Sequence, residues 1–472
     1  MALRALEAEV GLSCFLGAGQ RLQGQLRSQK FPMDLQRHDV LRSGEVLHLS
    51  SLGTGTSSPS KPFHCAVYLR GSSSLQERLA QELQVPKAAL RLGPRLRQPG
   101  VSVQLLSLPK GLPDKPPRET LTSGLLQDED ATLALGHTDL AEDGRSVAHR
   151  FSVVLRGLNP REAELLEDRV EEIRSNGFVN FFELALFGLA EVRHFEVGAC
   201  LWAGRWSDAC RLLLTANRRS SQLAPASQAF AQGDYERGLE LLPSGCKGLR
   251  SLAMNLLLKR SAHEALVKSL GRADWSRYLG AVSRLAWNRA AALRLQSLPL
   301  KPQPGDLVFD EKAGEPRPVT AKEVHEERWQ LRDLVLPLPR PSQAVPFSGG
   351  RLSMEAVLRE LCPEEDAAPE LFPLKLEQLL PKVRPLVAVP ADFSWDLAEG
   401  DGIRVPCDLS RLQPSDPPTT GGRRNRRERE GPALKLRATL GRTSSAEALI
   451  REVLKANPSE FQVALGRADE TF

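Results

Sequence analysis

Apolar and polar residues alternate over short stretches near both ends of the chain, as they do in strands with one buried face. The alternation predicts a β-hairpin over residues 34–52, turning at Ser43-Gly44, and strands over residues 63–70, 100–108 and 149–158. Residues 110–145 are polar and rich in turn formers, which indicates an insertion. The first third of the chain is therefore predicted to be rich in strands.

The pattern changes to a helical period after residue 158. Residues 159–177 predict a helix that Asn159 caps, that Pro160 suits in its first turn and that Asn176-Gly177 ends. Helical spacing then dominates residues 195–300, and residues 445–457 predict a closing amphipathic helix.

Strand-rich ends enclose a helical middle, which favours an α+β domain that carries an inserted second domain. Residues 412–432 are rich in Pro, Gly and Arg, a composition typical of a disordered loop. The predicted organisation is an N-terminal part of the first domain, an inserted domain and a return to the first domain, over residues 1–190, 191–390 and 391–472.

Charge and cysteine content narrow the function only slightly. The 472 residues carry a formal net charge of +5, which permits a polyanionic partner without requiring one. The seven cysteines are scattered with no CxxC pair, so we expect a reducing compartment and interpret His194 and Cys200 as structural residues, not metal ligands. No apolar run approaches the ~20 residues of a membrane span. We expect a soluble intracellular protein, in the nucleus or the cytoplasm, and the sequence leaves its oligomeric state open.

The stretch NGFVNFFELALFG, residues 176–188, resembles the Asn-Gly-x-x-Asn-Tyr-Phe-Gly-x-Gln-Arg-Phe-Gly motif of the TruD family of pseudouridine synthases. Further blocks follow in the family's order and resemble its eukaryotic version: YLGAVSRLAWNRAAALRL (278–295), GDLVFD (305–310), WQLRDLVLPLP (329–339) and VAVPADFSWDL (387–397).

This resemblance implies an α+β fold, in which a pseudouridine synthase catalytic domain with a mixed or antiparallel sheet is interrupted by a TruD-specific α/β domain. It implies isomerisation of uridine to pseudouridine in RNA, either tRNA or mRNA, without a cofactor or a metal. The family's reaction uses an Asp carboxylate next to the ribose and a pocket for a base that has left its stack.

The family's catalytic Asp is missing from the matching loop here, GPRLRQPGVSVQ. The loop carries one added residue, so either Leu96 or Arg97 occupies the Asp position. No Asp or Glu occurs between Glu82 and Asp114, so no realignment restores the carboxylate.

The resemblance assigns Asn180 and Phe182 to the base pocket, although each could instead have a local structural role. Glu183 stands where the family motif has Gly and is the one acidic residue gained within the motif. It could substitute for the missing Asp or could simply begin a helix. The basic residues that could contact RNA are Lys30, Arg91, Arg95 and Arg97.

Two functions from different classes remain. The chain is either a TruD-type RNA pseudouridine synthase or a catalytically inactive RNA-binding protein on the same scaffold. A weaker third reading is a protein-interaction scaffold that has also lost RNA.

Overall fold

The described residues of the computed structural model form two compact units, which we call the helical unit and the sheet unit. The helical unit draws on Met1–Ala18 and Phe178–Ala388, and the sheet unit on Gly19–Gly177 and Val389–Leu465. The assignment of residues 1–190 and 391–472 to a catalytic domain, and of residues 191–390 to an inserted domain, stays a prediction. The structure describes residues 2–27, 31–48, 64–70, 80–81, 85–86, 90, 96, 100–107, 125–127, 132–138, 146–162, 164–216, 222–340, 354, 357–361, 372–373, 381–398, 405–408 and 432–462.

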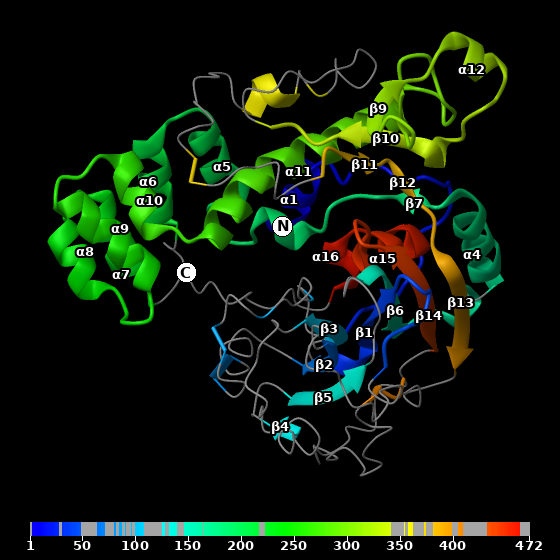
Figure 1. Cartoon of the computed structure of the whole chain (residues 1–472), viewed down its shortest axis with the longest axis horizontal. Coiled ribbons are helices and arrows are strands. Elements are labelled where there is room, and N and C mark those ends of the chain that lie inside the picture. The colour runs from blue at the N-terminus through cyan, green and yellow to red at the C-terminus, as the bar shows by residue number, and fades with distance from the viewer. Residues whose placement is uncertain are drawn as a thin grey trace, which may run out of the picture. The chain divides into compact units, whose positions relative to one another are not determined.

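An eight-stranded mixed sheet forms the centre of the sheet unit, in the order β13-β14-β6-β1-β3-β2-β5-β4 (Figure 1). Its neighbouring strands are antiparallel except for β1 and β3, which are parallel. The predicted α+β class with a mixed sheet is therefore confirmed. The strands are β1 (Leu35–Leu41), β2 (His64–Arg70), β3 (Val101–Ser107), β4 (Leu125–Gln127), β5 (Thr132–Thr138), β6 (Ser146–Leu155), β13 (Ala391–Ala398) and β14 (Ala433–Gly441).

The two faces of this sheet differ in polarity, as alternation along β6 shows. The odd-numbered residues in the second half of β6 are buried, whereas Arg150 and Ser152 are partly exposed. Residues paired across strands share a face, so the register places Gln36 and His38 of β1 beside Ser152 and Arg150. Arg437 of β14 joins them opposite Ser152. Three strands therefore contribute polar side chains to one partly open face.

Helices α4 (Glu164–Asn176) and α15 (Ala446–Leu454) pack together, and α4 also contacts β13. Arg169 of α4 donates from Nη1 to the carbonyl oxygen of Val453, 3.0 Å away, which joins the two helices. The predicted closing helix is confirmed, and the earlier one is confirmed from Glu164 onwards. Its predicted start was wrong, because Pro160–Glu162 forms a 3₁₀ turn and Oδ1 of Asn159 accepts from the backbone N–H of Arg161 at 3.1 Å within that turn. A short helix, α16 (Pro458–Phe461), follows α15.

Two expectations from the pattern were wrong in detail. The hairpin after β1 turns at Gly44, with φ of +86°, but the described part of its return arm, up to His48, forms a single bridge, between Val46 and Val40. On that edge of β1, residues 36–38 already pair with β3, so only the last residues of β1 are left for the return arm. The stretch 110–145 is not merely an insertion, because it supplies β4 and β5 to the sheet.

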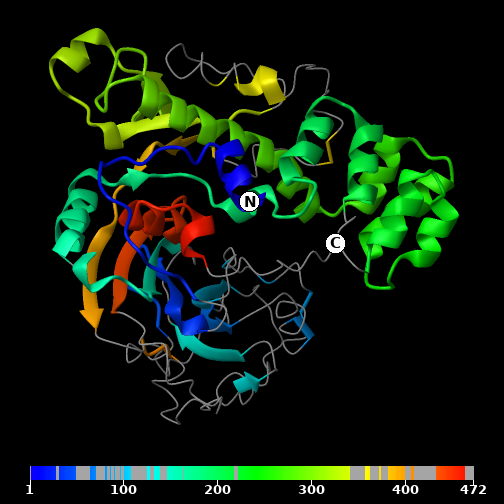
Figure 2. The same ribbon diagram turned by 180° about the vertical axis from the view of Figure 1, so that it is seen from behind.

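The helical unit is built around α11 (Arg272–Ser297), the long yellow-green helix of Figure 2. Trp275 and Trp287 of this helix are buried. Helix α5 packs closely on α11, since a Cβ on Gly198 would lie 2.2 Å from the carbonyl oxygen of Tyr278. The helices are α1 (Ala2–Glu9), α5 (His194–Trp202), α6 (Trp206–Thr215), α7 (Ala224–Ala231), α8 (Tyr235–Leu241), α9 (Lys247–Leu257), α10 (Ala262–Ser269), α11 (Arg272–Ser297) and α12 (Ala321–His325).

The same unit contains a four-stranded sheet in the order β11-β10-β8-β9 and the short pair β12-β7. These strands are β7 (Phe178–Val179), β8 (Leu307–Asp310), β9 (Glu315–Pro318), β10 (Leu334–Pro337), β11 (Val383–Pro385) and β12 (Val387–Ala388). Among the residues that the structure describes, no helix has both the length and the hydrophobicity needed to cross a membrane.

Candidate functional site

Asn180 ties the motif at residues 176–188 to strand β11 of the helical unit. Its side chain is fully buried, and Oδ1 accepts a hydrogen bond from Nη2 of Arg384 at 2.9 Å. Its Nδ2 donates to the carbonyl oxygen of Pro385 at 3.1 Å. The Asn180 side chain therefore bonds to the chain's own groups, as a positioning residue does.

Phe182 lies two residues further on and is partly exposed. Its backbone N–H donates to Oδ1 of Asn288 at 2.9 Å, and its ring meets Trp287 edge to face with 5.6 Å between centroids. The guanidinium carbon of Arg384 lies 3.8 Å from the centroid of the Phe182 ring. Two residues of α11 and one of β11 thus hold the ring in place.

Arg384 is a buried cation at the centre of this cluster, only 5% exposed. Burial lowers its pKa to about 9, and the nearby negative charge of Glu183 opposes that effect. Its Nε donates to the carbonyl oxygen of Asn180 at 2.8 Å, and its Nη2 donates to that of Phe181 at 3.3 Å. The guanidinium therefore holds the motif's backbone and supports the Phe182 ring at the same time.

Glu183 follows Phe182 and precedes a 3₁₀ turn at Leu184–Phe187. It is partly exposed, and its charge acts on Arg384. Glu183 therefore follows Phe182 directly in the chain, and its carboxylate is near enough to the buried guanidinium of Arg384 to affect its pKa.

In the sheet unit, the loop that should carry the catalytic Asp leads into β3. Leu96 is partly buried, and its Cδ1 lies 3.2 Å from where a Cβ on Gly100 would be. That Cβ would also lie 2.7 Å from the carbonyl oxygen of Leu35, so only glycine fits at residue 100. The apolar side chain of Leu96 therefore packs where the loop meets β1. The four basic residues predicted to contact RNA lie outside the described residues: Lys30, Arg91, Arg95 and Arg97.

Two buried carboxylates of the sheet unit are bound to groups of the chain itself. Asp34 forms a two-pronged ion pair with Arg156, at 2.7 and 2.8 Å, and burial raises the pKa of Asp34 in spite of that partner. Asp39 accepts hydrogen bonds from Nδ1 of His149 and from the backbone N–H of Leu105, each at 3.0 Å. Both carboxylates are therefore engaged by groups of the chain itself.

The partly open face of the eight-stranded sheet contains a cavity of about 210 Å³. It is smaller than the ~300 Å³ at which most organic-ligand pockets begin. Its lining is mainly polar and comprises Gln36, His38, Val46, His48, Arg150, Ser152, Val405, Pro406, Asp408 and Arg437.

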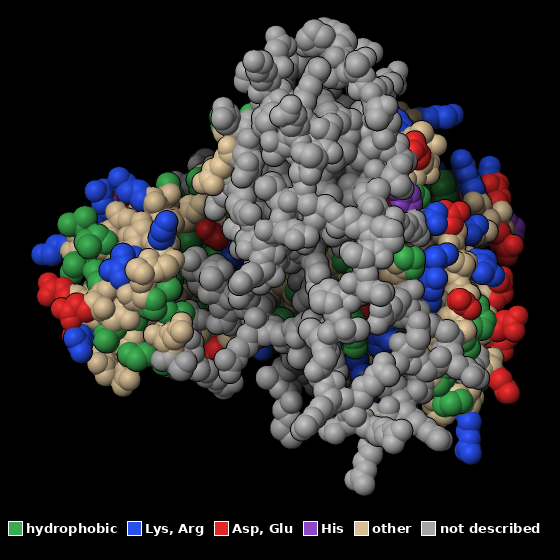
Figure 3. Space-filling view, turned by 90° about the horizontal axis from the view of Figure 1, so that it is seen from below, with side chains coloured by type: hydrophobic (Ala, Val, Ile, Leu, Met, Phe, Trp, Pro, Cys, Tyr) green, Lys and Arg blue, Asp and Glu red, His purple; other side chains and the backbone are tan. Residues whose placement is uncertain are grey.

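In the part of the chain that the structure describes, surface charges are mixed in sign and two buried cysteines have raised thiol pKa values. Figure 3 shows Lys and Arg side chains lying beside Asp and Glu on the visible face of the described residues. His194 stacks edge to face on Tyr278, and burial raises the thiol pKa of Cys200 and that of Cys210, the latter to about 12. The interpretation of His194 and Cys200 as structural residues agrees with these contacts.

The family model described as "TruD: tRNA pseudouridine synthase D (TruD)" matches residues 63–375. The chain belongs to the TruD family. The TruD-family chain is 24% identical to the mouse "Pseudouridylate synthase 7 homolog", over 67% of this chain and 47% of that protein. It is 25% identical to "tRNA pseudouridine synthase D" of Geobacter sulfurreducens, over 68% and 70%.

A solved TruD structure from Methanosarcina mazei superimposes with a TM-score of 0.63 at 18% identity, covering 97% of this chain and 99% of that one. At this identity, the likeness establishes the fold alone. The TruD-family chain spans about half the length of its mammalian relatives, 47% for both the mouse and the human proteins.

Arg384 is the residue of this TruD-family cluster that the motif did not reveal. It lies about 200 positions after Phe182 in the sequence, so local spacing carries no information about their contact. The available signal is a single cation in an otherwise apolar run, VRPLVAV, that forms β11 and β12. A charge in a buried strand needs a partner, and here the partners are Asn180 and Phe182.

Proposed function

We propose that this TruD-family chain binds RNA and isomerises a uridine in it to pseudouridine. In this reaction the N1–C1′ bond breaks, the base turns over and a C5–C1′ bond forms, while C5 loses a proton and N1 gains one. The product therefore contains the same atoms as the substrate, and the reaction needs no co-substrate. The names of the relatives, a pseudouridylate synthase and a tRNA pseudouridine synthase, support RNA uridine as the substrate class.

The observation that carries the proposal is the support of Phe182 by Arg384. A uridine that leaves its stack needs an aromatic surface to replace the lost stacking. The guanidinium lies 3.8 Å from the Phe182 ring centroid, and the ring remains partly exposed. We assign the flipped base to that exposed part of the ring, and Arg384 to positioning the ring.

The reaction also requires a carboxylate at the ribose, and Glu183 is the candidate that the motif supplies. It is adjacent to Phe182 in the chain and only partly buried, so a ligand stacked on Phe182 could reach it. Asp34 and Asp39 are much poorer candidates because both are buried in internal pairs. We therefore assign the missing carboxylate's role to Glu183.

The test is quantitative mapping of pseudouridine in RNA incubated with the purified chain, using Glu183→Gln as the variant. Glu191→Gln, an exposed carboxylate eight residues further on, is the matched control. We expect product from the unchanged chain and from Glu191→Gln, and its loss in Glu183→Gln. Product that persists in Glu183→Gln would exclude Glu183 as the carboxylate.

A second function is favoured by Leu96, the apolar side chain at one of the two possible Asp positions. If no described carboxylate replaces the Asp, the chain binds RNA without isomerising it. RNA binding without product, with product gained in Leu96→Asp, would establish this function. Absence of both product and RNA binding would reject both.

A further inference from the structure

His38, His48 and Asp408 converge on the cavity of the sheet unit from three separate segments. His38 belongs to β1, His48 follows the turn after β1, and Asp408 lies among the described residues 405–408. Nε2 of His38 lies 3.3 Å and Nδ1 of His48 lies 3.0 Å from the same oxygen, Oδ1 of Asp408. All three ligand atoms lie within 4.8 Å of one another.

These distances suit a tetrahedral zinc ion. With bonds of about 2.0 Å, neighbouring ligand atoms of such an ion are about 3.3 Å apart. The two contacts to Asp408 already have this spacing. The side chain of His48 is 33% exposed, so a small rotation of its ring would bring its nitrogen closer to that of His38. Two imidazoles and a carboxylate are also a common ligand set for zinc that keeps one position open.

Contacts within the chain hold these three residues close together. The backbone N–H of Leu47 donates to the carbonyl oxygen of Asp39 at 2.8 Å, which places His48 beside β1. Nε2 of Gln36 donates to the carbonyl oxygen of Val405 at 2.9 Å, and Cys407 packs in a buried cluster with residues of β1 and β3. A site held by surrounding contacts loses less entropy when it binds an ion.

The charges around the cavity are compatible with a cation. Asp408 is 2% exposed, and a divalent ion would supply positive charge beside this buried carboxylate. Arg150 also lines the cavity, but it forms an ion pair with Asp392 at 2.5 Å. Arg437 is exposed, so water weakens its repulsion of an ion.

We propose that His38, His48 and Asp408 form a zinc site, with the fourth coordination position open to the 210 Å³ cavity. The ion would bind residues 405–408 to β1 and to the turn that follows it. This role is independent of the proposed isomerisation, which uses Phe182 and Glu183 in the helical unit.

The experiment measures zinc binding by the full chain after treatment with a chelator. Metal content is determined by mass spectrometry after dialysis against Zn²⁺, and affinity by competition with a chromophoric chelator. We expect Asp408→Asn and His48→Asn each to weaken one site by at least about 100-fold, since loss of a group that merely orients a ligand already costs 10–100-fold. His48→Asn is the safer variant for folding because its side chain is partly exposed.

His263→Asn is the matched control, since His263 is a partly exposed histidine of the helical unit that stacks on Trp206. It should leave zinc affinity unchanged. Replacement of Zn²⁺ by Co²⁺ separates this site from any cysteine site, because nitrogen and oxygen ligands give visible absorption without a thiolate charge-transfer band. Equal affinity in the chain and in a folded His48→Asn variant, no zinc uptake, or a thiolate band alone would overturn the proposal.

Discussion

At the scale of single residues, the Phe182 cluster depends on the planar shape of Arg384. Arg384→Lys keeps a positive charge but loses the flat surface on Phe182 and several of the donors to backbone carbonyls. We expect it to lower the free energy of unfolding by about 1–3 kcal/mol, because buried acceptors lose their partners. We also expect weaker RNA binding, measured by titration.

Arg284→Lys serves as the control for this change, since its guanidinium carbon lies 6.0 Å from the same ring centroid. It should cost less than Arg384→Lys in both measurements. Equal effects would show that general positive charge, not the stacked geometry, supports Phe182.

A second prediction at the scale of single residues concerns the close contact of Gly100 with β1. Gly100→Ala places a methyl group 2.7 Å from the carbonyl oxygen of Leu35, so the backbone between β1 and the loop must shift. We expect a loss of about 1–3 kcal/mol in the free energy of unfolding, measured by urea denaturation. Gly441→Ala is the matched control, because its Cβ would meet nothing within 4 Å and its φ is not positive. A Gly100→Ala variant as stable as Gly441→Ala would mean that the loop adapts freely.

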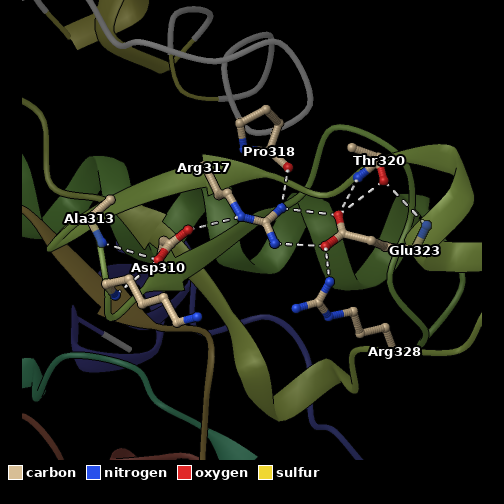
Figure 4. A network of polar contacts seen from close by, with 8 residues as sticks. Asp310, Ala313, Arg317, Pro318, Thr320, Glu323 and Arg328 are labelled. Carbon is tan, nitrogen blue, oxygen red and sulfur yellow. Dashed lines mark hydrogen bonds and ion pairs between the residues drawn. The ribbon is translucent and has the colours of Figure 1, made fainter.

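At the scale of elements, the β8–β9 hairpin and helix α12 are joined through one carboxylate (Figure 4). Glu323 accepts hydrogen bonds from Arg317 at 2.6 and 3.0 Å and from the backbone of Thr320 at 3.0 Å, and Arg328 lies 3.3 Å away. The hydrogen bonds from Arg317, followed by that from Thr320, hold the pKa of Glu323 well below its usual 4.5.

This low pKa predicts how stability depends on pH. In the unfolded chain Glu323 becomes protonated near pH 4.5, whereas in the folded chain it stays ionised at that pH. Its contribution to the free energy of unfolding is therefore complete above pH 4.5 and decreases below it. Glu323→Gln should therefore lower the unfolding midpoint most at pH 7, and the difference from the unchanged chain should shrink in acid. Glu326→Gln, at a more exposed position just after α12, should show little effect at either pH. A difference that stays constant with pH would contradict the role of the charge.

The elements also show what sequence pattern can predict. The strands predicted at residues 63–70 and 100–108 agree with β2 and β3 to within one residue at each end, because alternation is a local signal. Each predicted helix was correct at one end, since α4 ends at Asn176 but begins only at Glu164, and α15 begins at Ala446 but ends at Leu454. β5, with the sequence TLALGHT, was missed because Gly136 and flanking polar residues hide its alternation. Its place is set by pairing with β2, more than 60 positions earlier. The same limit applies to the site, where Phe182 was found through its motif and Arg384 and Asp408 were not.

At the scale of the whole molecule, the sign and number of charges predict how RNA binding responds to salt. A net charge of +5 over 472 residues is too small to attract RNA strongly as a whole, so binding should depend on a few local contacts. Four phosphate contacts to single-stranded RNA would give a slope of about −3 for the logarithm of affinity against that of salt concentration. Replacing the four predicted contacts together by alanine should bring that slope close to zero: Lys30, Arg91, Arg95 and Arg97.

The control for this prediction is a second quadruple alanine variant that removes the same charge from exposed helical positions: Arg211, Arg237, Lys247 and Lys268. It lowers the net charge equally but should leave the slope near −3, because these residues are not predicted to contact RNA. If both variants reduced the slope equally, net charge and not the loop before β3 would control binding. A slope that neither variant changes would instead place the phosphate contacts elsewhere, and the arginines of that loop would have no part in RNA recognition.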